Sequence, residues 1–297
     1  MIESRRVEIG NPVTDIAMPL SILDNHVHLH PQGHNVEAVK EFAKVGGTHL
    51  ILSHLPYEEV RVRSAADFPP SYDITLRLAE RCRQETKVGI DVTVGPYPVL
   101  LISLSEKHGL EKAIEIMRAG MESAQKLVLD GKAVGIGEIG RPHFPVSAEI
   151  NAASNQIMSY GMQLAKEANC PVVLHTETAT PDNMREIALM ADKVGLRRNK
   201  VVKHYSPPLI LEEENSGLFP SVLAKKESTL EALQKGSRFF LETDYLDDMR
   251  RPGAVLSITT VPKRTLNLLQ SGQMTEEQAF KIHVDNPLEV YGIKVRT

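Results

Sequence analysis

The sequence has few cysteines, which limits what can hold the fold together. Among its 297 residues there are two, Cys82 and Cys170, far apart in the chain. A disulfide framework or a cysteine-based zinc knuckle needs more thiols, so we expect both side chains to be buried and inert. The same scarcity predicts a reducing compartment.

Long apolar runs and a targeting segment are also missing. No window approaches the roughly 18 uninterrupted apolar residues of a membrane span. The N-terminal stretch MIESRRVEIG lacks the apolar core of a secretory signal. We therefore expect a cytoplasmic protein that does not engage a membrane.

Aromatic residues and net positive charge are scarce too. Aromatic side chains make up 5% of the chain, tryptophan is absent, and the formal net charge is -4. Extended binding of nucleic acid usually needs a basic surface and aromatic side chains on which bases stack. The overall composition therefore does not predict extended binding of nucleic acid, but it does not exclude a local binding patch. Two basic pairs, Lys225–Lys226 and Arg250–Arg251, either steer phosphates or are simply solvated.

Short β-branched runs alternate with longer amphipathic stretches along most of the chain. This alternation predicts a parallel sheet covered by helices, and the length suits one α/β barrel. Pro220 weakens the seventh apolar run. Strands are expected at 21–29, 48–55, 87–95, 133–140, 170–177, 199–206, 217–224 and 237–244, and helices at 35–44, 74–85, 111–131, 154–169, 265–272 and 275–292. We predict a TIM (β/α)8-type barrel that forms a single domain over residues 1–297, with its core at 21–297.

Six candidate metal ligands lie at or near the C-terminal ends of five of these expected strands. They are His26, His28, Glu138, His175, His204 and Asp244. An α/β barrel places its active site at that end of its strands. His26 and His28 are two apart, so their side chains point to the same side of a strand. Imidazole and carboxylate ligands suit zinc, manganese, iron or nickel, and the lack of cysteine ligands argues against a structural thiolate site.

Glu138 is the hardest of the six to explain without a metal ion. It lies on an apolar run, GIGEIG, where a buried unpaired carboxylate costs several kcal/mol. A salt bridge to Arg141 is the rival explanation. Glu177 and Glu242 neighbour two of the candidate ligands and either orient their imidazoles or pair with a nearby cation.

Five short strings carry a resemblance to a known family. They are DNHVHL (24–29), GEIGRP (137–142), VVLHTE (172–177), VVKHYS (201–206) and LETDYL (241–246). In order and spacing they resemble the motifs of the TatD-like metal-dependent hydrolases, the TatD-related deoxyribonuclease family of the amidohydrolase superfamily. The resemblance runs from about residue 22 to the end, where DNPLEVYG is similar to an Asn-Pro helix ending common in that family.

The resemblance implies a two-metal site and a hydrolytic activity. His26, His28 and Asp244 would hold one divalent ion, His175 and His204 the other, and Glu138 would bridge them. Zinc, manganese, magnesium, iron and nickel all remain candidates. Asp244 would also accept the proton of the attacking water, which makes Asp244 and Glu138 the expected catalytic pair.

The expected reaction is cleavage of a phosphodiester, as by a deoxyribonuclease. The alternative is a small-molecule amidohydrolase, lactonase or phosphotriesterase, favoured by the acidic net charge and the scarcity of aromatic residues. The partner is accordingly either a nucleic acid or a small-molecule ester. A barrel that binds metal only for regulation or scaffolding is a third interpretation. The oligomeric state is left open.

The chain departs from the family pattern after the bridging glutamate. Bacterial relatives usually continue that motif with Gly-Leu-Asp, whereas this chain reads Gly140-Arg141-Pro142-His143. The loop thus carries a cation and an extra imidazole, which suggests a different substrate. The candidate substrate contacts are Arg141, His143, His30 and Lys203, although Lys203 would face away from His204 in a regular strand.

Overall fold

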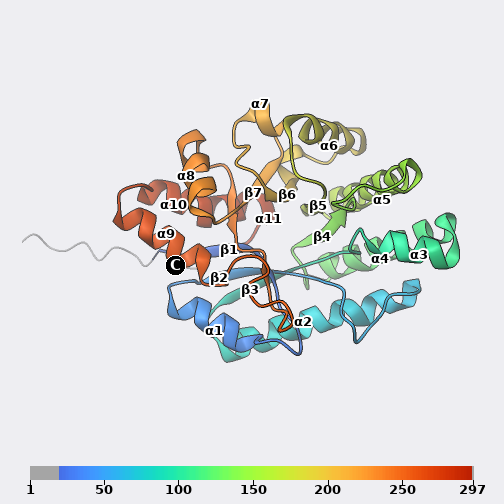
Figure 1. The fold of residues 1–297 in the computed structure, drawn as a ribbon, viewed down its shortest axis with the longest axis horizontal. Coiled ribbons are helices and arrows are strands. Elements are labelled where there is room, and N and C mark those ends of the chain that lie inside the picture. The colour runs from blue at the N-terminus through green and yellow to red at the C-terminus, as the bar shows by residue number, and fades with distance from the viewer. Residues whose placement is uncertain (1–19, 296–297) are drawn as a thin grey trace, which may run out of the picture.

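A computed structural model describes residues 20–295, so the N-terminal stretch discussed above and the first part of the predicted domain lie outside it. A core of parallel strands is surrounded by helices (Figure 1). The strands are β1 (Leu23–His28), β2 (His49–Ser53), β3 (Gly89–Val94), β4 (Gly135–Gly140), β5 (Val172–His175), β6 (Val201–Ser206), β7 (Phe219–Leu223), β8 (Phe240–Glu242) and β9 (Tyr245–Leu246).

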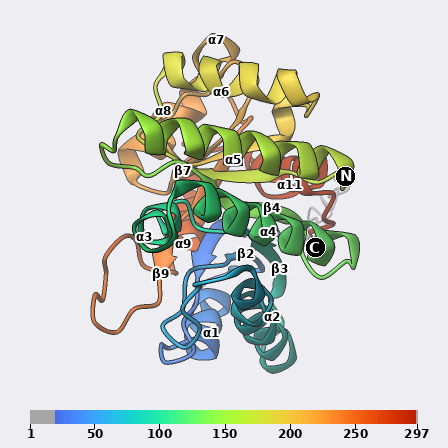
Figure 2. The same cartoon turned by 90° about the vertical axis from the view of Figure 1, so that its right-hand side faces the viewer.

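Helices follow most of the strands and cover the outside of the sheet. In Figure 2, α5 lies between α4 and α6 in this outer layer. The helices are α1 (Val36–Lys44), α2 (Phe68–Glu85), α3 (Leu100–His108), α4 (Leu110–Leu129), α5 (Ala148–Glu167), α6 (Pro181–Val194), α7 (Glu212–Asn215), α8 (Lys226–Lys235), α9 (Thr260–Gln270), α10 (Glu276–Phe280) and α11 (Asn286–Tyr291), with short segments η1 (Ala65–Asp67), η2 (Arg198–Lys200) and the π-helical η3 (Lys281–Asp285). None of these helices is long and apolar enough to cross a membrane.

The sheet closes through the short connection between β8 and β9. Its strand order is β8-β7-β6-β5-β4-β3-β2-β1-β9, and β9 pairs with β1 in parallel. Only Thr243 and Asp244 separate β8 from β9, so the two ends of the sheet are joined by continuous chain. The buried carboxylate of Asp24 on β1 accepts hydrogen bonds from the backbone N–H and the hydroxyl of Thr243, at 3.0 and 2.7 Å. The predicted α/β barrel architecture is confirmed.

Glycines on β4 allow close packing beside the expected bridging residue. A Cβ added at Gly137 would lie 2.6 Å from Cβ of Val173 on β5, closer than two carbon atoms can approach. Both strands are buried among apolar side chains, except for the half-buried His175 at the end of β5. Glu138 is therefore held on a tightly packed strand at the centre of the molecule.

The predicted strands are all present, and the differences concern mainly the helices. β7 forms despite Pro220, whose position pairs with Lys203 of β6. α2 begins six residues before the expected 74, at Phe68, because Pro69 and Pro70 fit the first helical turn. Helices α3, α6 and α8 were not predicted. Cys82 and Cys170 are both free and buried, as expected.

Candidate metal centre

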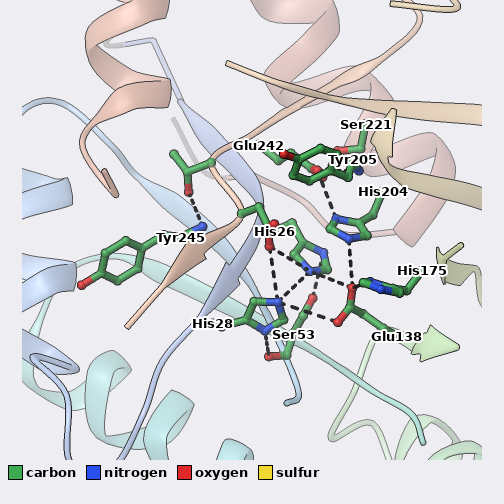
Figure 3. Close-up of polar contacts among 12 residues, drawn as sticks. His26, His28, Ser53, Glu138, His175, His204, Tyr205, Ser221, Glu242 and Tyr245 are labelled. Atoms are coloured by element: carbon green, nitrogen blue, oxygen red, sulfur yellow. Dashed lines mark hydrogen bonds and ion pairs between the residues drawn. The ribbon is translucent and has the colours of Figure 1, made fainter. Parts of the chain in front are cut away.

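The barrel brings the six candidate ligands together at the C-terminal ends of its strands. Figure 3 shows His26, His28, Glu138, His175 and His204 directed toward one another. His26 and His28 come from β1, Glu138 from β4, His175 from β5 and His204 from β6. Asp244 lies directly after β8, in the connection that closes the sheet, with φ of 47°. Most of these side chains are almost completely buried.

One group of donor atoms gathers around the two histidines of β1. The Nε2 atoms of His26 and His28 lie 3.1 Å apart. Glu138 places Oε1 3.5 Å from Nε2 of His26 and Oε2 3.8 Å from Nε2 of His28. Asp244 places Oδ1 3.5 Å from Nε2 of His28 and 3.9 Å from that of His26.

A second group shares the same glutamate. Oε1 of Glu138 lies 3.0 Å from Nε2 of His204 and 3.1 Å from Nδ1 of His175. The donor atoms of His26, His28 and Glu138 lie within 4.8 Å of one another, and so do those of Glu138, His175 and His204. Glu138 thus faces both histidine pairs, which is the position required of a residue that bridges two ions.

The outer nitrogens of three imidazoles are held by other groups of the protein. Nδ1 of His28 lies 3.0 Å from the carbonyl oxygen of Ser53, and Nδ1 of His26 lies 3.2 Å from the Ser53 hydroxyl. Nδ1 of His204 lies 3.1 Å from Oε1 of Glu242. Such contacts fix the ring orientation and leave Nε2 directed inward, as in protein metal sites. The donor set of imidazole nitrogens and carboxylate oxygens therefore fits divalent transition-metal ions.

The electrostatics of the centre favour cations. Burial would raise the pKa of Glu138, but the imidazoles of His175 and His204 outweigh it and hold that pKa well below its usual range. Burial likewise opposes ionisation of Asp244, while the nearby histidines hold its pKa below the ordinary value. Burial would lower the pKa of His204, yet Glu242 and Glu138 raise it to about 10. Without metal, protonated imidazole thus balances the buried carboxylates.

The sequence of the chain matches a family model described as TatD related DNase over residues 23–292. The chain belongs to the TatD-related DNase family. It is 38% identical over 280 residues to the uncharacterized protein MJ1127 of Methanocaldococcus jannaschii. The alignment covers 93% of this chain and 98% of that protein. The family is one of hydrolases, and the buried histidine and glutamate clusters could hold the metal ions on which its members depend.

Solved structures share the fold at low sequence identity. The TatD homologue YJJV of Escherichia coli K12 aligns with a TM-score of 0.64 and 19% identity, over 93% of this chain and 100% of that one. The phosphotriesterase homology protein of Escherichia coli, solved with phosphate in its active site, aligns with a TM-score of 0.63 and 13% identity, over 92% of this chain and 99% of that one. At these identities the likeness shows the fold alone.

The TatD-family chain has an additional imidazole next to the metal ligands. Nδ1 of the exposed His143 lies 2.8 Å from Nε2 of His175, and the hydroxyl of Tyr97 lies 3.4 Å from the same atom. His143, a predicted substrate contact, is thus beside the centre. Tyr97 was missed by the sequence analysis. Only its position in the loop after β3 could have indicated from the sequence that it lies near the site.

Arg141 lies behind the site and is engaged with acidic side chains. Its buried guanidinium donates to both carboxylate oxygens of Glu177, at 3.1 and 2.6 Å, and to Glu186 at 2.9 Å. The ion pairs of Arg141 are therefore made with residues other than Glu138, which removes the rival explanation of Glu138. Of the two neighbouring glutamates, Glu242 contacts an imidazole and Glu177 pairs with a cation.

The remaining predicted contacts differ in how close they lie to the centre. His30 is half-buried after β1 and packs against Tyr57, with ring centroids 5.8 Å apart. The exposed Arg250 pairs with Glu58 and Asp248, and Arg251 pairs with Asp248. Lys225 and Lys226 are exposed at the start of α8. None of these cations is directed at the metal ligands by an interaction among residues 20–295.

A cavity of about 340 Å³ opens beside the metal ligands. His175, His204 and Asp244 line it, and so does Lys203. Lys203 is buried, and burial lowers its pKa to about 8. The cavity volume falls within the range of small-molecule binding sites. A substrate could therefore reach the metal ligands through this space.

Proposed function

We propose that this chain hydrolyses phosphodiester bonds at a two-metal site formed by His26, His28, Glu138, His175, His204 and Asp244. The observation that carries the proposal is the position of Glu138, whose two carboxylate oxygens face histidines of both groups at 3.0 to 3.8 Å. When bound, two divalent ions would polarise the phosphoryl group and lower the pKa of water at the site.

The protein's own groups would orient the reactants and move the proton. Asp244 lines the cavity and holds Oδ1 3.5 Å from Nε2 of His28, so its carboxylate can accept the proton of a water that enters between cavity and ligands. Burial opposes its ionisation, but a hydrogen bond with His28 and the charges of His204 and His26 hold its pKa below the ordinary value, so the carboxylate is ionised at neutral pH and can accept a proton. The same group would then deliver that proton to the leaving oxygen.

The proposal is tested by turnover of model substrates. Protein loaded in turn with zinc, manganese, magnesium, iron or nickel is assayed with bis(p-nitrophenyl) phosphate, p-nitrophenyl acetate and a panel of lactones, beside His204→Ala loaded in the same way. We expect diester turnover in the native chain and its loss in the variant. Metal uptake without turnover of any substrate would contradict the proposal and favour a regulatory or scaffolding barrel.

A small-molecule ester, lactone or phosphotriester is the second candidate substrate class. It is favoured by the limited cavity of about 340 Å³ and by the net charge of -4. Salt dependence separates the two classes. The affinity of a nuclease that contacts several phosphates falls steeply as ionic strength rises, whereas the affinity of a pocket for a neutral ester does not. Ester or lactone turnover alone, insensitive to salt, would assign the chain to this second class.

A further inference from the structure

Lys203 is a buried cation with few partners. Its side chain is 1% exposed, and its Nζ donates one hydrogen bond, to the carbonyl oxygen of His204 at 2.6 Å. An ammonium group has three N–H donors. Within residues 20–295, no other acceptor lies within hydrogen-bond distance and no carboxylate within 4.0 Å of this nitrogen. Burying a charge in this way is costly unless a further partner arrives.

The carboxylates around Lys203 are already engaged by other groups. Glu242 accepts from the backbone N–H of Tyr205 at 2.7 Å and contacts the imidazole of His204. Glu177 is held by Arg141 in a two-pronged ion pair. Glu138 belongs to the metal centre. Lys203 therefore has no dedicated counter-ion among these residues, and its Nζ has N–H donors that make no hydrogen bond.

The end of β6 brings Lys203 to the same cavity as the metal ligands. The pairing of β6 with β7 shifts register between Lys203 and Ser206, and Tyr205 has a left-handed φ of 52°. Lys203 and His204 both line the cavity, although neighbours on a regular strand face opposite sides. Figure 3 shows Tyr205 beside His204 at this strand end.

The wall around Lys203 offers further hydrogen-bond donors. Thr176, Thr178 and Tyr205 line the cavity together with the lysine. Thr178 and Tyr205 are exposed, so their hydroxyls can reach a bound molecule from the entrance. A buried cation with neighbouring hydroxyls is suited to a compact group with several oxygen acceptors, such as a phosphate or a carboxylate.

We propose that Lys203 binds a second, non-reacting oxyanion of the substrate. The inference rests on the proposed function, because it takes the reacting ester to lie at the metal ligands that line the same cavity. Preferred substrates then carry a compact phosphate or carboxylate close to the bond that is cleaved. Among phosphodiesters, the preferred substrate is then a nucleotide that carries a terminal phosphate. Such a phosphate is found at the end of a strand and not in its interior, so we expect cleavage near strand ends.

Two pairs of chromogenic substrates test the inference on the full zinc-loaded chain. One pair is thymidine 5′-(4-nitrophenyl phosphate) with and without a 3′-phosphate, and the other is mono-(4-nitrophenyl) succinate and 4-nitrophenyl acetate. We expect a kcat/KM about tenfold or more higher for the member with the extra oxyanion, since a hydrogen bond to a charged group contributes about 1.5–3 kcal/mol. A preference within the first pair alone identifies phosphate as the ligand, and one within the second pair alone identifies carboxylate.

A matched pair of lysine variants assigns this preference to one residue. Lys203→Gln keeps a donor for the carbonyl of His204 but removes the charge, so the preference should fall towards unity, mainly through KM. Lys132→Gln is the control, because Lys132 is exposed at the opposite end of β4 and should keep the native preference. Preference retained in Lys203→Gln, or absent from the native chain, would overturn the inference.

A second variant decides the question if Lys203→Gln does not fold. Thr178→Glu adds a carboxylate on the exposed cavity wall, where it would compete for Lys203 and repel the substrate oxyanion. The preference of this variant for substrates with the extra oxyanion should fall, while its melting temperature stays close to the native value. An unchanged preference in this variant would contradict the inference.

Binding measurements separate failure of the inference from failure of the proposed function. Calorimetry compares thymidine 3′,5′-bisphosphate with thymidine 5′-phosphate on the zinc-loaded chain, and it needs no turnover. Equal affinities, together with equal kcat/KM within the succinate and acetate pair, would overturn the role of Lys203 whatever the activity towards phosphodiesters. Tighter binding of the bisphosphate without turnover of any substrate would leave that role intact and contradict the proposed hydrolysis.

Discussion

Glu242 holds the outer nitrogen of His204, with Oε1 3.1 Å from Nδ1, while Nε2 of the same ring lies 3.0 Å from Glu138. Glu242 is fully buried and also accepts hydrogen bonds from the backbone of Tyr205 and the hydroxyl of Ser221. The carboxylate therefore fixes the direction in which His204 presents its inner nitrogen, and it ties that ligand to β7 and β8.

Glu242→Gln should weaken metal binding without unfolding the chain. The amide keeps an acceptor for Tyr205 but removes the charge that makes the imidazole a better ligand, and such changes typically cost about 10–100-fold in metal affinity. Competition with a chromogenic chelator measures the effect. Glu231→Gln, on the exposed face of α8, serves as control and should bind metal as the native chain does.

Asp244→Asn should abolish most turnover and retain at least one metal ion. The amide oxygen can still face the histidines of β1, but the side chain can no longer accept a proton from water. Metal content by mass spectrometry and turnover of bis(p-nitrophenyl) phosphate are measured on the same sample. Turnover at the native rate would exclude Asp244 as the proton acceptor.

Asp24 should tolerate replacement by asparagine but not by alanine. Burial raises the pKa of this carboxyl to about 8, although the hydrogen bonds from Thr243 oppose the shift, so the neutral acid predominates at pH 7. The Oδ1 of an asparagine at this position can accept from the N–H groups of Thr243 and His26, and its Nδ2 can donate to the Thr243 hydroxyl, whereas alanine leaves both N–H groups without their acceptor. We expect Asp24→Ala to lower the free energy of unfolding by about 2–4 kcal/mol, and Asp24→Asn by less than about 1 kcal/mol. The free energy of unfolding of both variants is measured by urea unfolding at pH 7. An equal decrease in the two variants would contradict this account of the barrel closure.

His283 should make the fold sensitive to mild acid. Its buried ring lies between Thr265, at 2.9 Å, and the backbone of Leu23, and burial lowers its pKa to about 4 although the bond to Leu23 opposes the shift. In the unfolded chain the group takes up a proton below about pH 6.5, while in the folded chain it stays neutral to about pH 4. Its contribution to stability is therefore complete above pH 6.5 and is lost as the pH falls towards 4, by about 3 kcal/mol in total.

The pH dependence is measured by urea unfolding between pH 7 and pH 4. In His283→Gln, the slope of the free energy of unfolding against pH should be smaller over this interval than in the native chain. His108→Gln removes an exposed histidine of α3 and should leave the slope unchanged. Equal slopes in all three proteins would show that His283 is not buried in its neutral form.

The positions of the six candidate ligands could be predicted from sequence because they depend on local patterns. Apolar runs define the strands, parallel strands share one C-terminal edge, and ligand types at those ends fall together. His26 and His204 illustrate this, since each is placed by its own strand alone. β7 also formed as predicted despite Pro220, since the absent N–H costs only one hydrogen bond at that position.

Apart from Glu242, which the sequence already offered as a residue that orients an imidazole, the partners of these candidate ligands could not be predicted, because they depend on contacts between distant segments. Tyr97 reaches His175 from another loop, and Arg141 pairs with Glu186 of α6. The register shift between Lys203 and Ser206 is also one that no spacing rule reveals. α8 was missed for a related reason, since its short polar sequence KESTLEALQK has few apolar residues to mark a period.

The closure of the barrel also affects how this protein could be redesigned. Asp244 lies between β8 and β9, so the ligand is fixed on both sides by strands and does not depend on the loop that follows Leu246. The buried carboxylate of Asp247 accepts from the backbone N–H groups of His34 and Asn35, at 2.9 and 2.8 Å, and so anchors the start of that loop. Residues 249–256 can therefore be exchanged for segments of other lengths to alter substrate choice while the metal ligands stay in place.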